Sequence, residues 1–334
     1  MSTSTSTYYG PTNETSSDIN YERNFVAGDV IVGTGYGAQL VLFANCALFL
    51  WKRRRNRQSM YLLAYMSLML LIESLFVAVQ ARTVQMIYID NRNYPGGPWK
   101  FFLISQTAVV NVMFYATLFL LTFLSDLLVL WRCWVIWCAS GRRVVAWIAI
   151  SLPVLLLFAS FVMGTLWTLE SSQPNLSLYS KLPMSYGTSY YAISLGVNII
   201  LTALISGRLV SYRRTLAANL SPELAGHYIS LATIIIESAA LYSVFAILFL
   251  ITYAINNPTN QIWLGVASSC QQIGNQLIIF RVADGSAWQR DTLTNTAPIH
   301  FKSGTGQHVS TNIGSFHIAA PADPELALKD RTNV

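Results

Sequence analysis

Ionisable side chains within long apolar runs are the residues of this sequence with the most potential for chemistry. Three carboxyl groups, at Glu73, Asp126 and Glu237, lie among apolar residues. A charged group at the centre of a bilayer costs about 2.5–3.5 kcal/mol on insertion scales, so such side chains should face the interior of a helix bundle. There a carboxyl group can be protonated, bind a cation or respond to a ligand. The candidates for an intramembrane polar or switch site are Glu73, Asn111, Asp126, Arg132, Glu237, Gln272, Asn275 and Arg281.

The stretch SDLLVLWRCWVIW, residues 125–137, contains both Asp126 and Arg132. Six residues rotate a helix by about 240°, so these two side chains do not pair with each other. We expect Asp126 to bond to polar or basic groups on later helices, with Arg281 as one candidate, and either a static clamp or a moving switch would fit. Residues that recur every three or four positions predict one inward-facing stripe of this helix: Asn111, Tyr115, Leu118, Thr122, Ser125, Val129 and Arg132.

A second polar face is predicted in the last apolar run, residues 262–281. Its polar side chains fall within about one side of a helix: Ser268, Gln271, Gln272, Asn275 and Gln276. Amides in hydrocarbon are costly unless neighbouring groups or water satisfy them. This face therefore either hydrates a central cavity or holds helices together.

The placement of reactive side chains argues against several classes of protein. The four histidines are His227 and three residues near the C-terminus, so a zinc site inside a bundle is not predicted. All five lysines lie in predicted loops or in the tail, which excludes a retinal Schiff base. We expect no catalytic residue, no metal, no cofactor and no enzymatic activity. The net charge of +6 borders apolar runs on one side, so no nucleic-acid partner is predicted.

Composition and apolar runs together predict the fold class. Only 11% of the residues are charged, against roughly a quarter in soluble domains. Seven runs reach the length of about 20 apolar residues that spans a hydrocarbon core of about 30 Å. Such long runs are typical of helices and not of alternating barrel strands. The predicted class is all-α, a polytopic membrane protein with seven transmembrane helices, near residues 29–51, 59–80, 104–131, 144–167, 188–210, 228–255 and 262–281.

Basic residues predict the orientation of these helices. The last residues of the first, third, fifth and seventh runs and the segments just beyond them, as far as Arg290, carry 13 Lys and Arg residues, and the opposite segments carry 5. Because short cytoplasmic loops collect Lys and Arg, the N-terminus should be outside and the C-terminus cytoplasmic. We expect residues 1–28 to be extracellular, residues 29–281 to form the transmembrane domain, and residues 282–334 to form a largely disordered cytoplasmic tail.

Covalent modification is predicted at two kinds of position. The sequons at Asn13 and Asn175 would lie outside and are glycosylation candidates. Cys133 and Cys138 would lie near the inner membrane surface and are lipidation candidates, although unmodified thiols are the favoured interpretation.

Three motifs carry a resemblance to a known group of proteins. They are LSDLLVLWRCWVIW, IIIESAALYSVF and QLIIFRVADGSAW, at residues 124–137, 234–245 and 276–288. In these motifs the sequence resembles a large family of uncharacterised, receptor-like seven-transmembrane proteins from mushroom-forming fungi, over about residues 25–290. The resemblance implies topology more firmly than function. The sequence lacks the Asp-Arg-Tyr, Cys-Trp-x-Pro and Asn-Pro-x-x-Tyr motifs of familiar receptors, so coupling to a G protein is only an analogy.

The resulting functional hypothesis is a receptor-like sensor in a fungal plasma membrane. An extracellular or membrane ligand, or a protonation, would change the packing of the polar faces, and a cytoplasmic signalling protein would read the inner loops. The alternative is a transporter or channel that uses Glu73, Glu237 and the polar face of the seventh helix.

Overall fold

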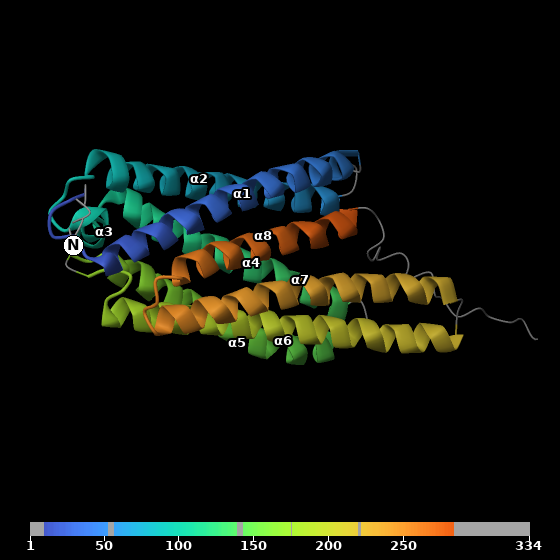
Figure 1. Ribbon diagram of the computed structural model, residues 1–334. Helices are drawn as coiled ribbons and strands as arrows, with labels where there is room; N and C mark the ends of the chain where they lie inside the picture. The colour runs from blue at the N-terminus through green and yellow to red at the C-terminus, as the bar shows by residue number, and fades with distance from the viewer. Residues whose placement is uncertain (1–9, 53–56, 139–142, 175, 220–221, 284–334) are drawn as a thin grey trace, which may run out of the picture. The chain divides into compact units, whose positions relative to one another are not determined.

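The computed structural model describes residues 10–52, 57–138, 143–174, 176–219 and 222–283 (Figure 1). Within these ranges the side chains at 58, 143, 213–235 and 281–283 lie outside the description. The described residues are all-helical, with no strand among them. In chain order, the elements are α1 (Ser16–Lys52), α2 (Arg57–Gln85), the π-helical segment η1 (Met86–Asp90), α3 (Gly97–Ile104), α4 (Val109–Cys138), α5 (Arg143–Ser171), α6 (Lys181–Asn219), α7 (Pro222–Ala254) and α8 (Asn260–Ala283).

Six helical segments among the described residues are long and apolar enough to cross a membrane. They lie in α1, α2 with η1, α4, α5, α6 and the Ile236–Ala254 part of α7. These segments support a multi-pass membrane protein. The seventh predicted run forms α8, which is helical but is not one of the six. Several glutamine and asparagine side chains lie in α8, and they lower its mean hydropathy below that of the six segments.

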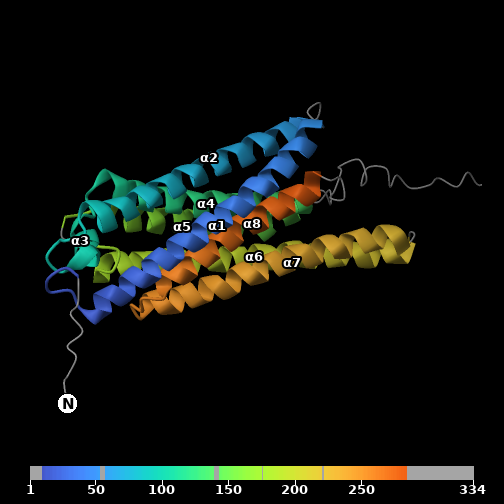
Figure 2. The ribbon, with the colours of Figure 1, turned by 45° about the horizontal axis from the view of Figure 1, so that its top comes forward.

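Helix α4 lies at the centre of the packing. It contacts α2, α5, α6 and α8, and the neighbouring pairs α1 with α2, α5 with α6, α6 with α7, α7 with α8 and α8 with α1 also pack together. In α4, 56% of the most apolar window is buried, against 22–39% in the other five spans. In both views, α6 and α7 lie side by side and extend beyond their neighbours at the end away from α3 (Figures 1 and 2). Residues on α4 are therefore placed to contact several helices at once.

Helix α1 begins earlier than the predicted span at Asp29. Thr15 and Asp18 form a capping box: the Asp18 amide donates to Thr15 Oγ1 at 3.2 Å, and the Thr15 amide donates to Asp18 Oδ2 at 3.1 Å. This reciprocal cap satisfies free amides of the first turn. Thirteen residues of the segment predicted to precede the first span are consequently helical, from Ser16 to Gly28.

Four segments meet at one end of the bundle, which we call the α3 end; the end at which α8 finishes is called the tail end. The Tyr21 ring of α1 stacks on Trp99 of α3 with centroids 4.9 Å apart, and the Tyr21 hydroxyl donates to the Asn256 carbonyl at 2.6 Å. Trp99 also contacts Tyr179, in the α5–α6 connection, at a centroid distance of 5.5 Å. The sequence predicted these four segments on one side of the membrane, and the fold brings them together.

The segment around Pro95 was predicted to be a loop, but it leads into the short helix α3. Gly96 and Gly97 have φ values of 94° and 86°, in the left-handed region that glycine adopts without strain. Pro98 then occupies the first turn, where its missing amide proton costs no hydrogen bond. The Glu22 side chain of α1 accepts a bond from the Trp99 amide at 2.9 Å, which fixes the start of α3 to α1.

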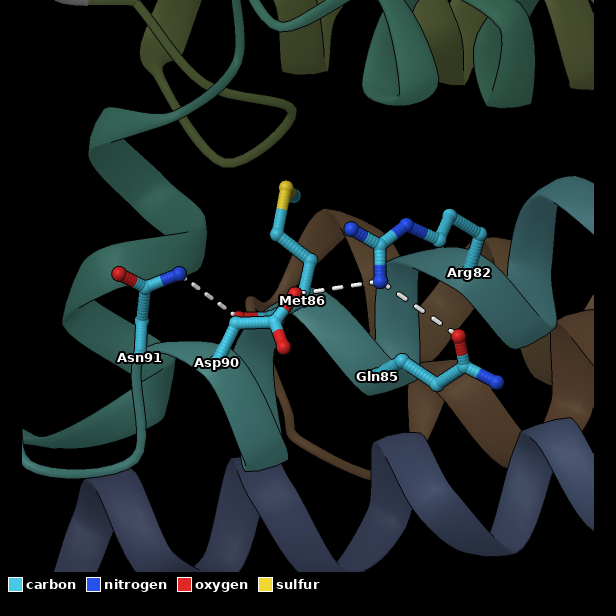
Figure 3. A network of polar contacts seen from close by, with 5 residues as sticks. All are labelled: Arg82, Gln85, Met86, Asp90 and Asn91. Carbon is cyan, nitrogen blue, oxygen red and sulfur yellow. Dashed lines mark hydrogen bonds and ion pairs between the residues drawn. The ribbon is translucent and has the colours of Figure 1, made fainter.

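The π-helical segment η1 ends α2 at the α3 end and is closed by polar contacts (Figure 3). Arg82 lies between Gln85 and Asp90, with its guanidinium 3.1 Å from the Asp90 carboxylate. The Asn91 side chain donates to the Met86 carbonyl at 2.9 Å. Both carboxylate and guanidinium are about half exposed, so this ion pair contributes little to stability.

Candidate functional site

Asp126 lies where α4, α6 and α8 meet, and it is 1% exposed. The Ser194 hydroxyl of α6 donates to Asp126 Oδ2 at 2.5 Å, and the Gln271 amide of α8 donates to Asp126 Oδ1 at 3.2 Å. Each carboxyl oxygen thus bonds to a different helix. We call Asp126, Ser194 and Gln271 the Asp126 cluster. It joins three helices that are distant in sequence through one buried carboxyl group.

The hypothesis that Asp126 bonds to polar groups on later helices is confirmed by its bonds to Ser194 and Gln271. Arg281 lies ten residues beyond Gln271 on α8, or about 15 Å at 1.5 Å per residue. The side chain of Arg281 lies outside the described residues.

The predicted stripe of α4 faces inward, as expected: all seven of its residues are buried. Its two ends have different roles. At the α3 end, the Asn111 amide donates to the Ser105 carbonyl at 2.7 Å and so holds the start of α4 against the end of α3. Asn111 therefore lies fifteen residues before Asp126 on α4, or about 22 Å, and belongs to the α3 end.

The four amide residues of the predicted polar face of α8 are buried, whereas Ser268 is half-buried, and only part of the face is satisfied. Gln272 donates to Ser125 of α4 at 2.9 Å. Asn275 and Gln276 each keep one polar atom without a hydrogen-bond partner, as does Asn198 of α6. A buried polar atom without a partner costs about 1–3 kcal/mol, so α6 and α8 hold unused hydrogen-bonding capacity.

Glu73 forms a second buried carboxyl site between α1 and α2. It is 2% exposed, and its Oε1 atom accepts a bond from Gln39 of α1 at 3.3 Å. Within the described ranges, its Oε2 atom has no hydrogen-bond partner. The adjacent Ser74 shares a hydrogen bond of 2.7 Å with Tyr36. In the part of the chain that the structure describes, the single ion pair is that of Arg82 with Asp90, so neither Glu73 nor Asp126 has a paired cation there.

Arg132, the last residue of the predicted inward-facing stripe, is buried near the tail end of α4. Its relative exposure is 7%, and its three guanidinium nitrogens have no hydrogen-bond partner among the described residues. Leu128, one turn earlier, packs with α1, α2 and α8. These helices cover the tail-end half of α4, which explains why Arg132 is enclosed.

The expectation that Glu237 faces the bundle interior is wrong, because this side chain is exposed. Seventeen residues, or about 26 Å, separate it from Ala254 at the α3 end of α7. That distance approaches the full hydrocarbon thickness of about 30 Å, so Glu237 lies near the tail-end edge of a membrane and not at its centre. A carboxyl group at that depth can remain in contact with water.

The candidates for covalent modification differ in accessibility. Asn13 is exposed, with a φ of 64°, two residues before the cap of α1, whereas Asn175 lies outside the described residues. Cys133 is fully buried in a hydrophobic cluster, which contradicts its candidacy for lipidation, since acyl transfer requires an accessible thiol. Cys138 is half-buried and stays a candidate. No group of three or more His, Cys, Asp or Glu side chains comes together among the described residues.

Three small cavities lie in the bundle between the α3 end and the Asp126 cluster. They have volumes of about 10, 20 and 10 Å³ for the centre of a water molecule, so each has room for about one water. Leu118 of α4 and Leu264 of α8 line all three and separate them. Thr122, Ser268 and Gln271 line the middle cavity. Gln271 therefore contacts both this cavity and Asp126.

Aromatic residues enclose these cavities on the α3 side. Trp167 and Tyr190 stack with centroids 6.2 Å apart, and Tyr191 meets Phe249 edge-on at 4.8 Å. Tryptophans are enriched at membrane–water interfaces, but Trp167 is only 1% exposed and packs inside the bundle. Burial also raises the pKa of the Tyr179 phenol above its usual range, which keeps its hydroxyl protonated as a donor.

Sequence reasoning missed Ser194 and Gln39 as partners of the two buried carboxyl groups. A single serine in an apolar run is common, and no local pattern marks it as functional. Gln39 is a stronger signal, since it is a large amide within the first apolar run. It could have been grouped with Glu73 by the same cost argument that identified Asp126.

Comparisons of this chain with models of known protein families, with curated proteins and with solved structures found no match. The function must therefore be inferred from the geometry of its own residues.

Proposed function

We propose that this chain is a receptor-like membrane protein that senses a ligand inside its helix bundle. In this proposal α8 is the seventh transmembrane helix, the α3 end faces the outside, and the tail end faces the cytoplasm of a fungal cell across its plasma membrane. The basic segments that follow α1, α4, α6 and α8 favour this orientation. A cytoplasmic signalling protein would read changes at the tail end.

The observation that carries the proposal is the double contact of Gln271. Gln271 lines the middle cavity, and its amide donates to Asp126 at 3.2 Å. A ligand oxygen in that cavity would compete with Asp126 for the same amide. Because Asp126 also bonds to α6 through Ser194, loss of the Gln271 bond would change how α8 is held against α4 and α6. Such a local exchange of partners is a physical route from ligand binding to helix movement.

The test is replacement of the native gene by an Asp126→Asn variant, with surface abundance matched to wild type. The amide keeps the size of the side chain but changes its hydrogen-bonding pattern, since one acceptor oxygen becomes a donor. We expect the transcript profile of these cells to differ from that of wild type. The change should match that of a gene deletion if the variant is inactive, or be opposite to it if the variant is permanently active. Asp90→Asn is the matched control, because it removes an exposed carboxylate at the α3 end. A wild-type profile in the Asp126→Asn cells would contradict the proposal.

A transporter or channel is the second candidate, and the free Oε2 atom of Glu73 favours it. A buried carboxyl oxygen with no partner is suited to bind a proton or a cation in transit. In this case, purified protein in liposomes would carry proton or cation flux along an imposed gradient, and Glu73→Gln would abolish it. Equal flux in protein-free liposomes would remove this alternative.

A further inference from the structure

Asn45 of α1 is an exception among the amide side chains of the bundle. The seven predicted spans contain ten Asn and Gln residues, of which nine are buried and Asn45 is exposed. It precedes Trp51 by six residues, or about 9 Å, so its short side chain lies at hydrocarbon depth in a membrane. An amide that faces hydrocarbon is costly unless a neighbouring group satisfies it.

The Asn45 amide is only partly satisfied within the chain. Its Nδ2 atom donates to the Val41 carbonyl at 2.8 Å, one turn earlier in the same helix. Its Oδ1 atom and its second amide hydrogen bond to no described residue. One acceptor and one donor are therefore left for a polar partner at the same depth.

Two glycines on the same helix also have no use inside the bundle. Gly28 and Gly35 face inward, and a Cβ atom added at either would collide with atoms of α8. A Cβ atom added at Gly33 or Gly37 would meet nothing within 4 Å among the described residues. Because glycine weakens a helix relative to alanine, the structural use that remains for this outer pair is the close approach of another helix.

The outer glycines and Asn45 belong to one exposed row of α1. Gly33, Gly37, Val41 and Asn45 are spaced by four residues, and all four are exposed. We call this row the α1 ridge. Among the described elements α1 packs on α2, α3 and α8, which leaves the ridge at the surface of the bundle. Helices that pack through such rows cross with a right hand, and glycines in the row let their backbones come close.

A second copy of this chain has the chemistry that the α1 ridge requires. Copies that insert in one orientation are related by a twofold axis along the membrane normal, so each residue of α1 meets its counterpart at equal depth. The donor and acceptor left on one Asn45 then match those of the other, and the two amides can form a reciprocal pair of hydrogen bonds. An unrelated helix would have to carry a matching polar group at that depth, whereas symmetry supplies it.

We infer that this chain forms a parallel dimer in the membrane through the α1 ridge. The glycines set the close approach of the two α1 helices, and the paired Asn45 amides fix their register. The inference does not rest on the proposed sensory function, because it requires only that α1 spans the membrane.

The test measures association of the full-length chain in lipid. The purified chain carries one monomeric fluorescent protein at its C-terminus, and photobleaching steps are counted in liposomes over a range of protein-to-lipid ratios. We expect wild type to bleach in two steps and to become single-step on dilution in lipid. Asn45→Leu should raise the dimer dissociation constant roughly three- to thirty-fold, the range that corresponds to hydrogen bonds between membrane helices.

Steric variants test the glycines. The double variant Gly33→Ile with Gly37→Ile places branched side chains in the contact, so we expect monomers at ratios where wild type is dimeric. Both positions face open space in a single copy, so the fold should be kept, which circular dichroism checks. Gly207→Ile on α6 is the matched control, because Gly207 is also exposed and a Cβ atom there meets nothing within 4 Å among the described residues. It should keep the wild-type dissociation constant.

Cross-linking tests which helix lies at the contact. A disulfide requires Cα atoms within about 7 Å, so Val41→Cys should give a covalent dimer when the liposomes are oxidised. Leu155→Cys on α5 is the control, since Leu155 is 68% exposed on a different helix, and it should give no more covalent dimer than wild type.

Four results would overturn the inference. Monomers at every ratio would leave lipid as the neighbour of the α1 ridge. A dimer that persists in the double glycine variant, or that cross-links through Leu155→Cys and not through Val41→Cys, would place the contact on another helix. Equal dissociation constants for wild type and Asn45→Leu would show that the amides do not pair.

Discussion

Removal of the Ser194 hydroxyl tests whether the Asp126 cluster holds the helices together. Ser194→Ala takes away one of the two bonds to Asp126 and leaves Oδ2 buried without a partner. The serine is fully buried and its bond spans α4 and α6, so water cannot readily replace it.

The expected loss of stability follows from the environment of this bond. Hydrogen bonds to charged groups in soluble proteins contribute about 1.5–3 kcal/mol. Bonds between membrane helices average only about 0.6 kcal/mol and reach about 1.7 kcal/mol, because the unfolded chain also finds partners in the membrane. The bond of Ser194 with Asp126 is fully buried and joins two membrane helices, so its contribution should lie near the upper end of the second range. We therefore expect Ser194→Ala to lower the free energy of unfolding by about 1–2 kcal/mol.

The assay is reversible unfolding of the purified chain in mixed micelles, followed by circular dichroism. Ser151→Ala is the matched control, since the Ser151 hydroxyl is exposed and bonds within its own helix to the Ile148 carbonyl at 2.8 Å. A double-mutant cycle with Asp126→Asn then isolates the energy shared by the two side chains. If Ser194→Ala and Ser151→Ala have equal effects and the coupling is near zero, the carboxyl group does not hold α4 to α6 and the reasoning fails.

Two further predictions follow from side chains in the same bundle. Leu118→Ala should join the three cavities and lower the unfolding free energy by about 2–5 kcal/mol in the same assay. A loss below about 1 kcal/mol would mean that neighbouring side chains close over the vacated space. Arg132→Met should raise the unfolding free energy, by about 1–4 kcal/mol, because it removes an enclosed guanidinium without a partner and keeps an apolar stem. A clear loss of stability would show that Arg132 has an acceptor that these contacts do not include.

Local patterns predicted the helices and their inward faces well. The three-and-four spacing on α4 identified seven residues that are all buried, and the cost of amides in hydrocarbon predicted that the polar face of α8 turns inward. The same reasoning failed at Glu237, because depth in a membrane depends on where a helix ends. It also failed at α3, where two left-handed glycines and Pro98 start a helix within a segment rich in turn residues.

The sequence by itself predicted the long apolar helices, because helix length and periodicity are properties of one segment. It also predicted which few polar side chains turn inward, because the cost of placing a polar group in hydrocarbon can be judged from that segment alone. Only the tertiary structure decided the partners of those groups. Ser194 and Gln271 lie 68 and 145 positions from Asp126, and no local spacing relates residues at such separations. Their meeting is fixed by which helix faces pack together, and so is the cavity that Gln271 lines.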